Sequence, residues 1–590
     1  MSKNNLVLSS KKKCISFEDN NIFFDERVFC SIDLETFKKK IKHIVAENIL
    51  DDRKIRVDSF KSCDYIYQSV IKDLSKNLNK INEVDWCVNS WSIVLGGWLR
   101  RFIYIIFYKF NILKNILSKY HIDNVYLANS STNELTSHES AFIHDLSIDD
   151  DWNHILNSKI FSYISANKYI NKKYIDIDKK NFYEKKTFFE KVNNNKDLLK
   201  KAAKDIFSML KVLSSKNDSL ILNSYLPLVK EKQLELLFFQ IPKFFKLQKI
   251  NYKRYDQKIR EKLNIKKRCL HVEKIVRDYI PTYLPTYVLE NFKEVLSASK
   301  KVGYPLSPKF IFTSNSFEHN ELFKFYVAEI KNTNKNVKYF IGQHGGAYIT
   351  QIDNNYSNEV LTCDYFLSWG EKKFNHVNTL PLFNLKLPKK RNKRKREFIS
   401  LIFRSLGYQC VPYSRISEGK KEFILANSFL ENLPENLKNF IYLKFHDTFY
   451  ERPNNFLHHL IDYKIYKNCE FMNYKEVIEQ SKIVCFCYDS TGFLENISSQ
   501  IPSVCLYPDI FNKLNEDCIV YYQDLKNAKI IFDNEKDLIT HLQNIWPDVD
   551  AWWESENVQN QIKKTIKLFS NYSGKYPLLT IKKLISEKLN

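Results

Sequence analysis

Residues 309–342 read KFIFTSNSFEHNELFKFYVAEIKNTNKNVKYFIG, and this stretch decides the fold class of the chain. Apolar runs at 310–313 and 337–342 are typical of short buried strands, and residues 316–330 between them place apolar side chains on one face of a helix. A strand, a helix and a second strand in this order form a βαβ unit with parallel strands. The stretch therefore predicts an α/β protein.

Further apolar runs of the same kind follow, separated by helical segments. They lie at 364–369, 398–403, 441–445, 483–488 and 503–507. Runs of this kind build doubly wound parallel sheets, so the sequence predicts two Rossmann-like lobes.

The lobes are expected to meet at a charged segment. We place the N-terminal lobe, the acceptor side, at residues 1–375, with a Lys- and Asn-rich helical insertion at about 155–300 that elaborates it. A basic linker at 376–397 leads to the C-terminal lobe at 398–590, which ends in helices.

The composition excludes several classes of protein. Hydrophobic residues make up 44% and aromatic residues 15% of the 590 residues, which excludes a disordered or fibrous chain. The 12 cysteines include no C-x-x-C pair, so we expect no metal site and free thiols in a reducing cytosol. No signal-peptide pattern opens the sequence, and its most apolar stretch, 102–110, is shorter than a membrane span, so we expect a cytoplasmic protein.

The net charge of +23 raises the alternative of a nucleic-acid-binding protein. The densest basic run is KLPKKRNKRKR at 386–396, and such a run binds nucleic acid or an anionic membrane surface, or is an exposed linker. The chain shows no zinc-finger spacing, helix-turn-helix or aromatic RNA-binding strand. We therefore expect no nucleic-acid partner, and at most a peripheral contact with a membrane.

Residues 488–495, YDSTGFLE, follow an apolar strand and open a helix. The N-terminus of a helix at the carboxyl end of a parallel strand offers N–H groups and a positive dipole to a phosphate. Ser490 and Thr491 add hydroxyl groups, and Gly492 lets a ligand approach the backbone. The alternative is an ordinary helix start that Asp489 or Ser490 caps, with nothing bound.

Residues 342–348, GQHGGAY, follow another predicted strand in a chain with only 11 glycines. Gly345 and Gly346 suggest a loop whose backbone touches a ligand, with Gln343 beside it. His344 is a candidate general base or hydrogen-bond donor. The alternative is a tight turn in which the histidine satisfies backbone groups.

Two weaker signals add candidate residues. Lys444 and His446 end a strand one βα unit before the 488–495 motif, so His446 is expected near Ser490, unless it is a structural histidine. Glu139 and Asp145 lie in a segment rich in His, Asp and Glu and are candidates for acid, base or nucleophile, unless the segment is a solvated acidic cluster.

With these motifs the sequence resembles a family of bacterial surface-carbohydrate transferases of lipopolysaccharide and capsule synthesis. That family shares an L-G-x-W-L segment, a D-x-W-N segment, a Q-H-G-G-x-Y loop and a strand followed by D-x-W-G. Here they stand as Leu95–Leu99, Asp150–Asn153, Gln343–Tyr348, and Asp364 with Trp369 and Gly370.

The second lobe also resembles the capsule Kdo transferases, which have a GT-B fold and use a CMP-activated ulosonic acid. The resemblance implies a GT-B-like fold without an obligatory metal, with His446, Ser490 and Thr491 on the CMP phosphate and Glu495 near the ribose. A similar pairing of motifs, His344-Gly345 with Asp489-Ser490, resembles the teichoic-acid polyol-phosphate transferases, which use CDP-glycerol.

The sequence thus predicts a glycosyltransferase of bacterial surface polysaccharide synthesis. We expect it to move a Kdo or other nonulosonic acid from a CMP-sugar to a glycan or lipid-linked acceptor at the inner face of the cytoplasmic membrane, without a cofactor. The catalytic candidates are His344, Glu139 and Asp145. The candidates for substrate binding are Gln343, Gly345, Gly346, Lys444, His446, Asp489, Ser490, Thr491, Gly492 and Glu495. The alternatives are CDP-polyol phosphate transfer, nucleic-acid binding, and an inactive GT-B scaffold.

Overall fold

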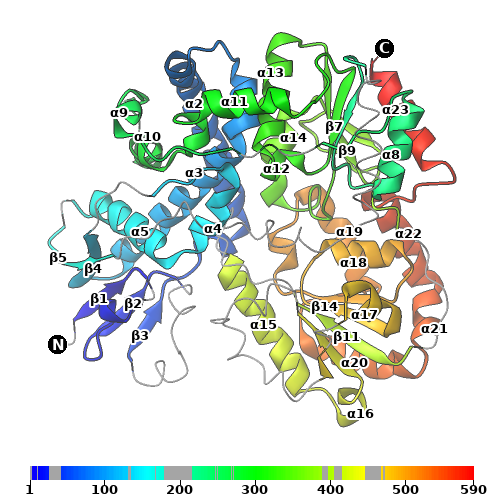
Figure 1. Cartoon of the computed structure of the whole chain (residues 1–590). Helices are drawn as coiled ribbons and strands as arrows, with labels where there is room; N and C mark the ends of the chain where they lie inside the picture. Colours follow the sequence, from blue (N-terminus) through cyan, green and yellow to red (C-terminus); the bar gives the residue numbers. More distant parts are fainter. Residues whose placement is uncertain are drawn as a thin grey trace.

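The computed structural model places helices around three parallel β-sheets that follow one another along the chain (Figure 1). The structure describes residues 3–9, 11–25, 41–129, 135–166, 168–177, 215–245, 248, 250–267, 269, 271–388, 396–403, 415–445, 467–468 and 472–589.

The N-terminal sheet has the strand order β3-β2-β1-β4-β5. Its strands are β1 (Asn4–Val7), β2 (Asn20–Phe23), β3 (His43–Val45), β4 (Asn124–Asn129) and β5 (Asn171–Asp176). The order reverses between β1 and β4. The segment that carries Glu139 follows β4, so it leaves the sheet at the position where parallel sheets bind ligands.

Two long helices connect this sheet to the rest of the molecule. α2 (Arg53–Asn82) packs along α3 (Val88–Lys119), and α3 also packs against α5 (Asp150–Ile164) and α13 (Glu321–Thr333). α3 is apolar around most of its circumference because neighbours cover it on several sides. Among the described residues, no helix combines the length and the apolarity that crossing a bilayer requires.

The middle sheet has the order β10-β9-β8-β7-β6 and confirms the βαβ unit predicted at residues 309–342. Its strands are β6 (Leu220–Ile221), β7 (Phe310–Thr313), β8 (Lys338–Gly342), β9 (Tyr365–Ser368) and β10 (Thr379–Pro381). The single helix expected between β7 and β8 is two, α12 (Ser316–His319) and α13, because Asn320 caps the start of α13.

The C-terminal sheet has the order β13-β12-β11-β14-β15-β16, and the strand order reverses between β11 and β14. Its strands are β11 (Phe398–Ile402), β12 (Ile441–Lys444), β13 (Lys467–Asn468), β14 (Ser481–Phe486), β15 (Ser503–Leu506) and β16 (Ile531–Phe532). The motif at 488–495 follows β14, so it too lies at a reversal point, where ligands bind in such sheets.

The C-terminal helices return to the middle sheet. α22 (Glu556–Phe569) packs on α18 (Thr491–Ser498), and α23 (Pro577–Leu589) packs on α8 (Leu228–Leu237) (Figure 1). The middle sheet with its helices forms one unit, the middle unit, and the C-terminal sheet with its helices forms another, the C-terminal unit. A linker and the return of the C-terminal helices join these two units in a GT-B-like arrangement, as predicted.

The segment expected as one N-terminal lobe, residues 1–375, therefore holds two sheets, the second of which starts at Leu220. The segment expected as a helical insertion at about 155–300 contains β5 and β6, which are edge strands of the two sheets, as well as helices such as α10 (His271–Tyr283) and α11 (Phe292–Lys301). Residues 178–214 of that insertion lie outside the described residues.

Candidate active site

The loop after β8 touches the start of α18. The Gly346 N–H donates to the Thr491 hydroxyl over 3.1 Å. A Cβ on Gly346 would lie 3.4 Å from Thr491 Cα, so the loop backbone lies within van der Waals contact of the helix start. The two strongest motifs of the sequence therefore meet in space, although about 145 positions separate them.

Ser490 caps α18, since its hydroxyl accepts from the Phe493 N–H over 3.0 Å. Asp489 has a different role. Its buried carboxylate accepts from the Tyr522 hydroxyl over 2.9 Å and from the Gln351 side chain over 3.2 Å, and burial raises its pKa. The aspartate thus ties the end of the glycine loop to α19 (Ile519–Asn527).

The structure gives a reason for glycine at position 492 that could not be predicted from the sequence. A Cβ at this position would lie 2.6 Å from the Tyr474 hydroxyl oxygen and 3.3 Å from the Phe486 ring. The Tyr474 hydroxyl therefore fills the space on the Cβ side of Gly492, and the approach of a ligand to the Gly492 backbone stays a prediction.

Glu495, one turn into α18, pairs with a lysine from the linker. Its carboxylate lies 2.6 Å from the Lys386 ammonium, which also lies 5.5 Å from the centre of the Tyr225 ring. Lys386 begins the basic run of the sequence, and the structure pairs it with Glu495 beside Tyr225 while its side chain stays 39% exposed. Residues 389–395 of that run lie outside the described residues.

His344 lies among three aromatic rings. Its ring centre is 5.0 Å from that of Tyr348 and 5.7 Å from those of Tyr225 and Phe317. Burial lowers the pKa of His344 to about 4, an effect that Glu318 opposes and Lys386 reinforces. The imidazole is therefore neutral at pH 7 and able to accept a proton.

A buried carboxylate reaches His344 through Tyr348. The Tyr348 hydroxyl donates to Glu359 over 2.5 Å and lies 3.1 Å from His344 Nδ1. Since the hydroxyl gives its proton to Glu359, it can act toward the imidazole only as an acceptor. Burial raises the pKa of Glu359. Arg101 of α3 pairs with Glu318 over 2.6 Å at the same place.

Comparison of the sequence with models of protein families shows the family of this protein. The family model described as LIC12162 family transferase matches residues 4–585, and so covers all three sheets. The protein is a member of the LIC12162 transferase family. No curated protein matches it.

Among solved structures, glycosyltransferases resemble about half of this LIC12162 family transferase. Each of three covers 50% of this chain and 80% of its own. They are MurG of Acinetobacter baumannii (8% identity, TM-score 0.27), the spinosyn forosaminyltransferase SpnP (11%, 0.29) and the spinosyn rhamnosyltransferase SpnG complexed with spinosyn aglycone (9%, 0.28).

Glu139 of the LIC12162 transferase is adjacent in sequence to a residue of the cavity that Glu318 and Glu359 line. It accepts a hydrogen bond from the Tyr252 hydroxyl over 2.9 Å. Ser140, the next residue, lines a small cavity together with Glu318 and Glu359. Asp145 belongs to α4 (Ile143–Ile148), and its side chain lies outside the described residues.

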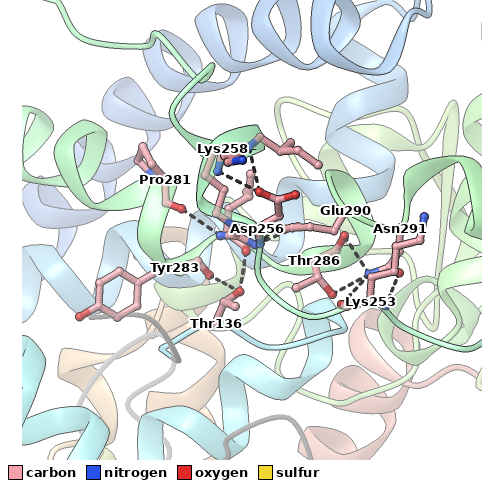
Figure 2. Close-up of polar contacts among 12 residues, drawn as sticks. Thr136, Lys253, Asp256, Lys258, Pro281, Tyr283, Thr286, Glu290 and Asn291 are labelled. Carbon is pink, nitrogen blue, oxygen red and sulfur yellow. Dashed lines mark hydrogen bonds and ion pairs between the residues drawn. The ribbon is translucent and has the colours of Figure 1, made fainter. Parts of the chain in front are cut away.

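A scaffold of polar contacts holds this acidic segment (Figure 2). The Thr136 hydroxyl lies 3.4 Å from the Tyr283 carbonyl oxygen, and the Asn291 side chain links the Lys253 N–H to Thr286 over 2.6 and 3.0 Å. A buried pair of Glu290 with Arg260, at 2.6 Å, joins the same scaffold. These contacts fix the chain next to Tyr252, the partner of Glu139.

The remaining predicted residues have different outcomes. Gln343 donates to the Gly345 carbonyl over 2.7 Å and accepts from the Trp369 N–H over 3.0 Å, so it shapes the loop. Lys444 ends β12 and is buried. His446 lies outside the described residues, so its approach to Ser490 stays a prediction.

An open cleft lies between α2 and the C-terminal sheet. It has a volume of about 570 Å³, which is in the range of small-molecule sites. Its lining consists of Asp51, Asp52, Arg53, Lys54, Val57, Asp58 and Asn512. Asn512 follows β15 at the carboxyl edge of the sheet. No local pattern in the sequence indicates this cleft, since its two walls are more than 400 residues apart.

Among the described residues, no group of three or more His, Cys, Asp or Glu side chains is arranged to hold a metal ion.

Proposed function

We propose that this transferase is a GT-B glycosyltransferase that moves a Kdo or other nonulosonic acid from a CMP-sugar to a glycan or lipid-linked acceptor of the bacterial surface. The observation that carries the proposal is the contact of the glycine loop with the start of α18, at the strand-order reversal of the C-terminal sheet. A nucleotide phosphate is the ligand that such a helix start binds best.

The donor phosphate would lie at the first turn of α18. The N–H groups of Thr491 and Gly492 and the helix dipole would stabilise the charge on departing CMP. Lys386 would supply positive charge to the same phosphate or to the donor carboxylate, while Glu495 holds its side chain in place. In this proposal the helix start and Lys386 do the work that other transferases give to a metal ion.

His344 would act as the general base. Its neutral imidazole would take the proton of the acceptor hydroxyl as the oxygen bonds to the anomeric carbon and the bond from that carbon to the phosphate oxygen breaks. CMP leaves with the electron pair. Glu318, and Glu359 through Tyr348, would stabilise the imidazolium that forms. Glu139 and Asp145 remain second candidates for this role.

A lipid-linked acceptor would bring the protein to the inner face of the cytoplasmic membrane, as a peripheral protein of the cytoplasm. CDP-polyol phosphate transfer is the runner-up, because it needs the same cytidine phosphate at the same helix start.

Thermal unfolding with CMP, CDP, UDP, GDP, ADP or a short DNA duplex tests the donor. A ligand at 100 times its Kd adds about 2.7 kcal/mol to the free energy of unfolding. We expect CMP alone to raise the Tm, and Ser490→Ala with Thr491→Val to abolish the increase. Release of CMP from CMP-Kdo should fall at least about 100-fold in His344→Ala, which keeps the CMP-induced increase in Tm.

Other outcomes revise the proposal in defined ways. Selective stabilisation by CDP favours polyol-phosphate transfer. Stabilisation by UDP or GDP would support a GT-B transferase that uses another donor. Stabilisation by DNA alone would contradict the proposal that the protein is an enzyme.

A further inference from the structure

Two helices on the middle unit present apolar side chains to solvent. α8 and α23 pack side by side (Figure 1). Val229 and Leu236 of α8 lie two turns apart on one side of the helix and are 68% and 56% exposed. Lys582 of α23 lies 4.7 Å from the centre of the Phe239 ring, so the outward sides of the helices adjoin. We call this surface the α8–α23 face; its exposed apolar residues are Leu228, Val229, Leu236, Phe239, Tyr576 and Leu579.

Phe239 is held outward by a strained backbone. It follows the end of α8 with a φ of 57°, in the left-handed region where glycine is usual. Its N–H donates to the Leu236 carbonyl over 2.9 Å, and Gln240 behind it bonds both backbone groups of Ser219. The phenyl group is nonetheless 90% exposed. The fold therefore bears a conformational cost for a ring that it does not bury.

Lysines surround these apolar side chains. The lysines of the two helices and their flanks that reach solvent are Lys230, Lys575, Lys582, Lys583 and Lys588, whereas Lys232 is largely buried and pairs with Glu235 over 2.6 Å. Glu231 and Glu235 of α8 are buried, and Glu231 accepts hydrogen bonds from Ser224. Over residues 228–239 and 575–589, all of which the structure describes, Glu587 is the one exposed acidic side chain. The face is therefore apolar at its centre and cationic around it.

We propose that the α8–α23 face docks the protein on an anionic lipid bilayer. Phe239, Leu236 and Val229 would enter the headgroup region, and the lysines would meet lipid phosphates. A bilayer fits this face because it accepts protruding single side chains and rewards cationic charge around them, without requiring a matching groove.

The face lies close to the site. α8 begins three residues after Tyr225, whose ring lies beside His344 and Lys386. The ten residues of α8 rise about 15 Å along the helix axis. Phe239, just after the end of α8, therefore lies roughly that far from Tyr225, which precedes the helix. The inference deepens the proposed membrane-linked acceptor, and it gives that acceptor a short path from the bilayer to His344.

Co-sedimentation of the full chain with vesicles, without nucleotide or acceptor, tests the inference. We expect binding to vesicles of equal parts phosphatidylglycerol and phosphatidylcholine, little binding to phosphatidylcholine alone, and a loss of binding at high salt. Phe239→Gly should reduce the bound fraction about tenfold while its Tm stays equal or rises, because glycine relieves the left-handed strain.

Further variants separate the forces. Lys582→Gln with Lys583→Gln should weaken binding to anionic vesicles at least about fivefold. Tyr65→Ala is the matched control, since Tyr65 is an aromatic residue on α2 that is 74% exposed away from the face. It should bind vesicles as the unmodified protein does.

Three results would overturn the inference: no binding to anionic vesicles, unchanged binding by Phe239→Gly, or a dimer in solution that Phe239→Gly dissociates, which would make the face a contact between two copies. Stabilisation by CMP is measured without lipid, and vesicle binding is measured without nucleotide. Each experiment can therefore contradict its own proposal, the transfer reaction or the membrane contact, without affecting the other.

Discussion

The His344 imidazole has neighbours that act on its pKa in opposite directions. Burial among aromatic rings disfavours the charged form, and Glu318 favours it; burial prevails and brings the pKa to about 4. A histidine in solution has a pKa near 6.5. Between these values the unfolded chain binds a proton that the folded protein does not.

This difference predicts a pH-dependent stability. The contribution of His344 is fully present above pH 6.5 and is lost as the pH falls toward 4. From pH 7 to pH 5 the unmodified protein should lose about 2 kcal/mol more unfolding free energy than His344→Gln. Urea titrations at both pH values measure this, with His121→Gln, at an exposed histidine, as control. Parallel losses in the unmodified protein and His344→Gln would show that the imidazole is charged in the folded state.

Site residues with distinctive local chemistry could be predicted from the sequence, and the others could not. His344 and Thr491 stand next to glycines directly after apolar runs, and that is a local signal. Tyr225 and Glu359 come from a loop and a short helix of ordinary composition, and Lys386 opens a basic run whose sequence does not tell a linker from a site. Only the folded chain brings them to His344, so no spacing rule finds them.

At the scale of elements, α17 (Tyr474–Gln480) packs against α18 at Gly492. Gly492→Ala should lower the free energy of unfolding by about 1–3 kcal/mol, since the new methyl group meets the Tyr474 hydroxyl. Removing that oxygen with Tyr474→Phe in the same chain should recover most of the loss. Gly345→Ala is the control, because its Cβ would lie 3.5 Å from the nearest atom.

Chemical denaturation of the four proteins measures these values. A loss in Gly492→Ala that Tyr474→Phe does not recover would mean that the glycine serves the backbone instead.

Strands of four to six apolar residues in the middle and C-terminal sheets could be predicted from the sequence, because they are buried on both faces. In the N-terminal sheet the run at 125–128 predicts β4 and the apolar run at 5–10 overlaps β1, whereas β2, β3 and β5 were missed. β3 has three residues, and β5, NKKYID, is an edge strand with exposed lysines that looks like the Lys- and Asn-rich text around it. Short strands and polar edge strands carry too little periodicity to be distinguished from loops.

At the scale of the whole molecule, two kinds of ion pair join the N-terminal unit to the rest. Arg56 of α2 and Asp353 are both almost fully buried and lie 3.1 Å apart. Lys421 of α15 (Arg415–Glu431) pairs with Asp51 over 2.8 Å and with Asp509 over 3.1 Å, but it is exposed to solvent.

Arg56→Met should therefore lower the free energy of unfolding by about 3–5 kcal/mol, because it removes the guanidinium that pairs with the buried Asp353 carboxylate. Lys421→Met should cost less than about 1 kcal/mol. Urea titrations at low and high salt compare the two, and only the Lys421 contribution should vanish at high salt. Equal losses in the two variants would contradict this assignment.

The chain passes twice between the middle and C-terminal units, and the two passages are bonded to each other. The Asn384 N–H donates to the Asn571 carbonyl over 3.1 Å, and its side chain donates to Ser570 over 3.1 Å. These two bonded passages would serve as a pivot for a rotation between the two units. α15 lies on the opposite side of the C-terminal unit from α22 (Figure 1), so a rotation of a few degrees at this pivot moves Lys421 much farther than it moves Asn571. Substrate entry and product release would then be governed by leverage, with the widest gap opening between α15 and α2.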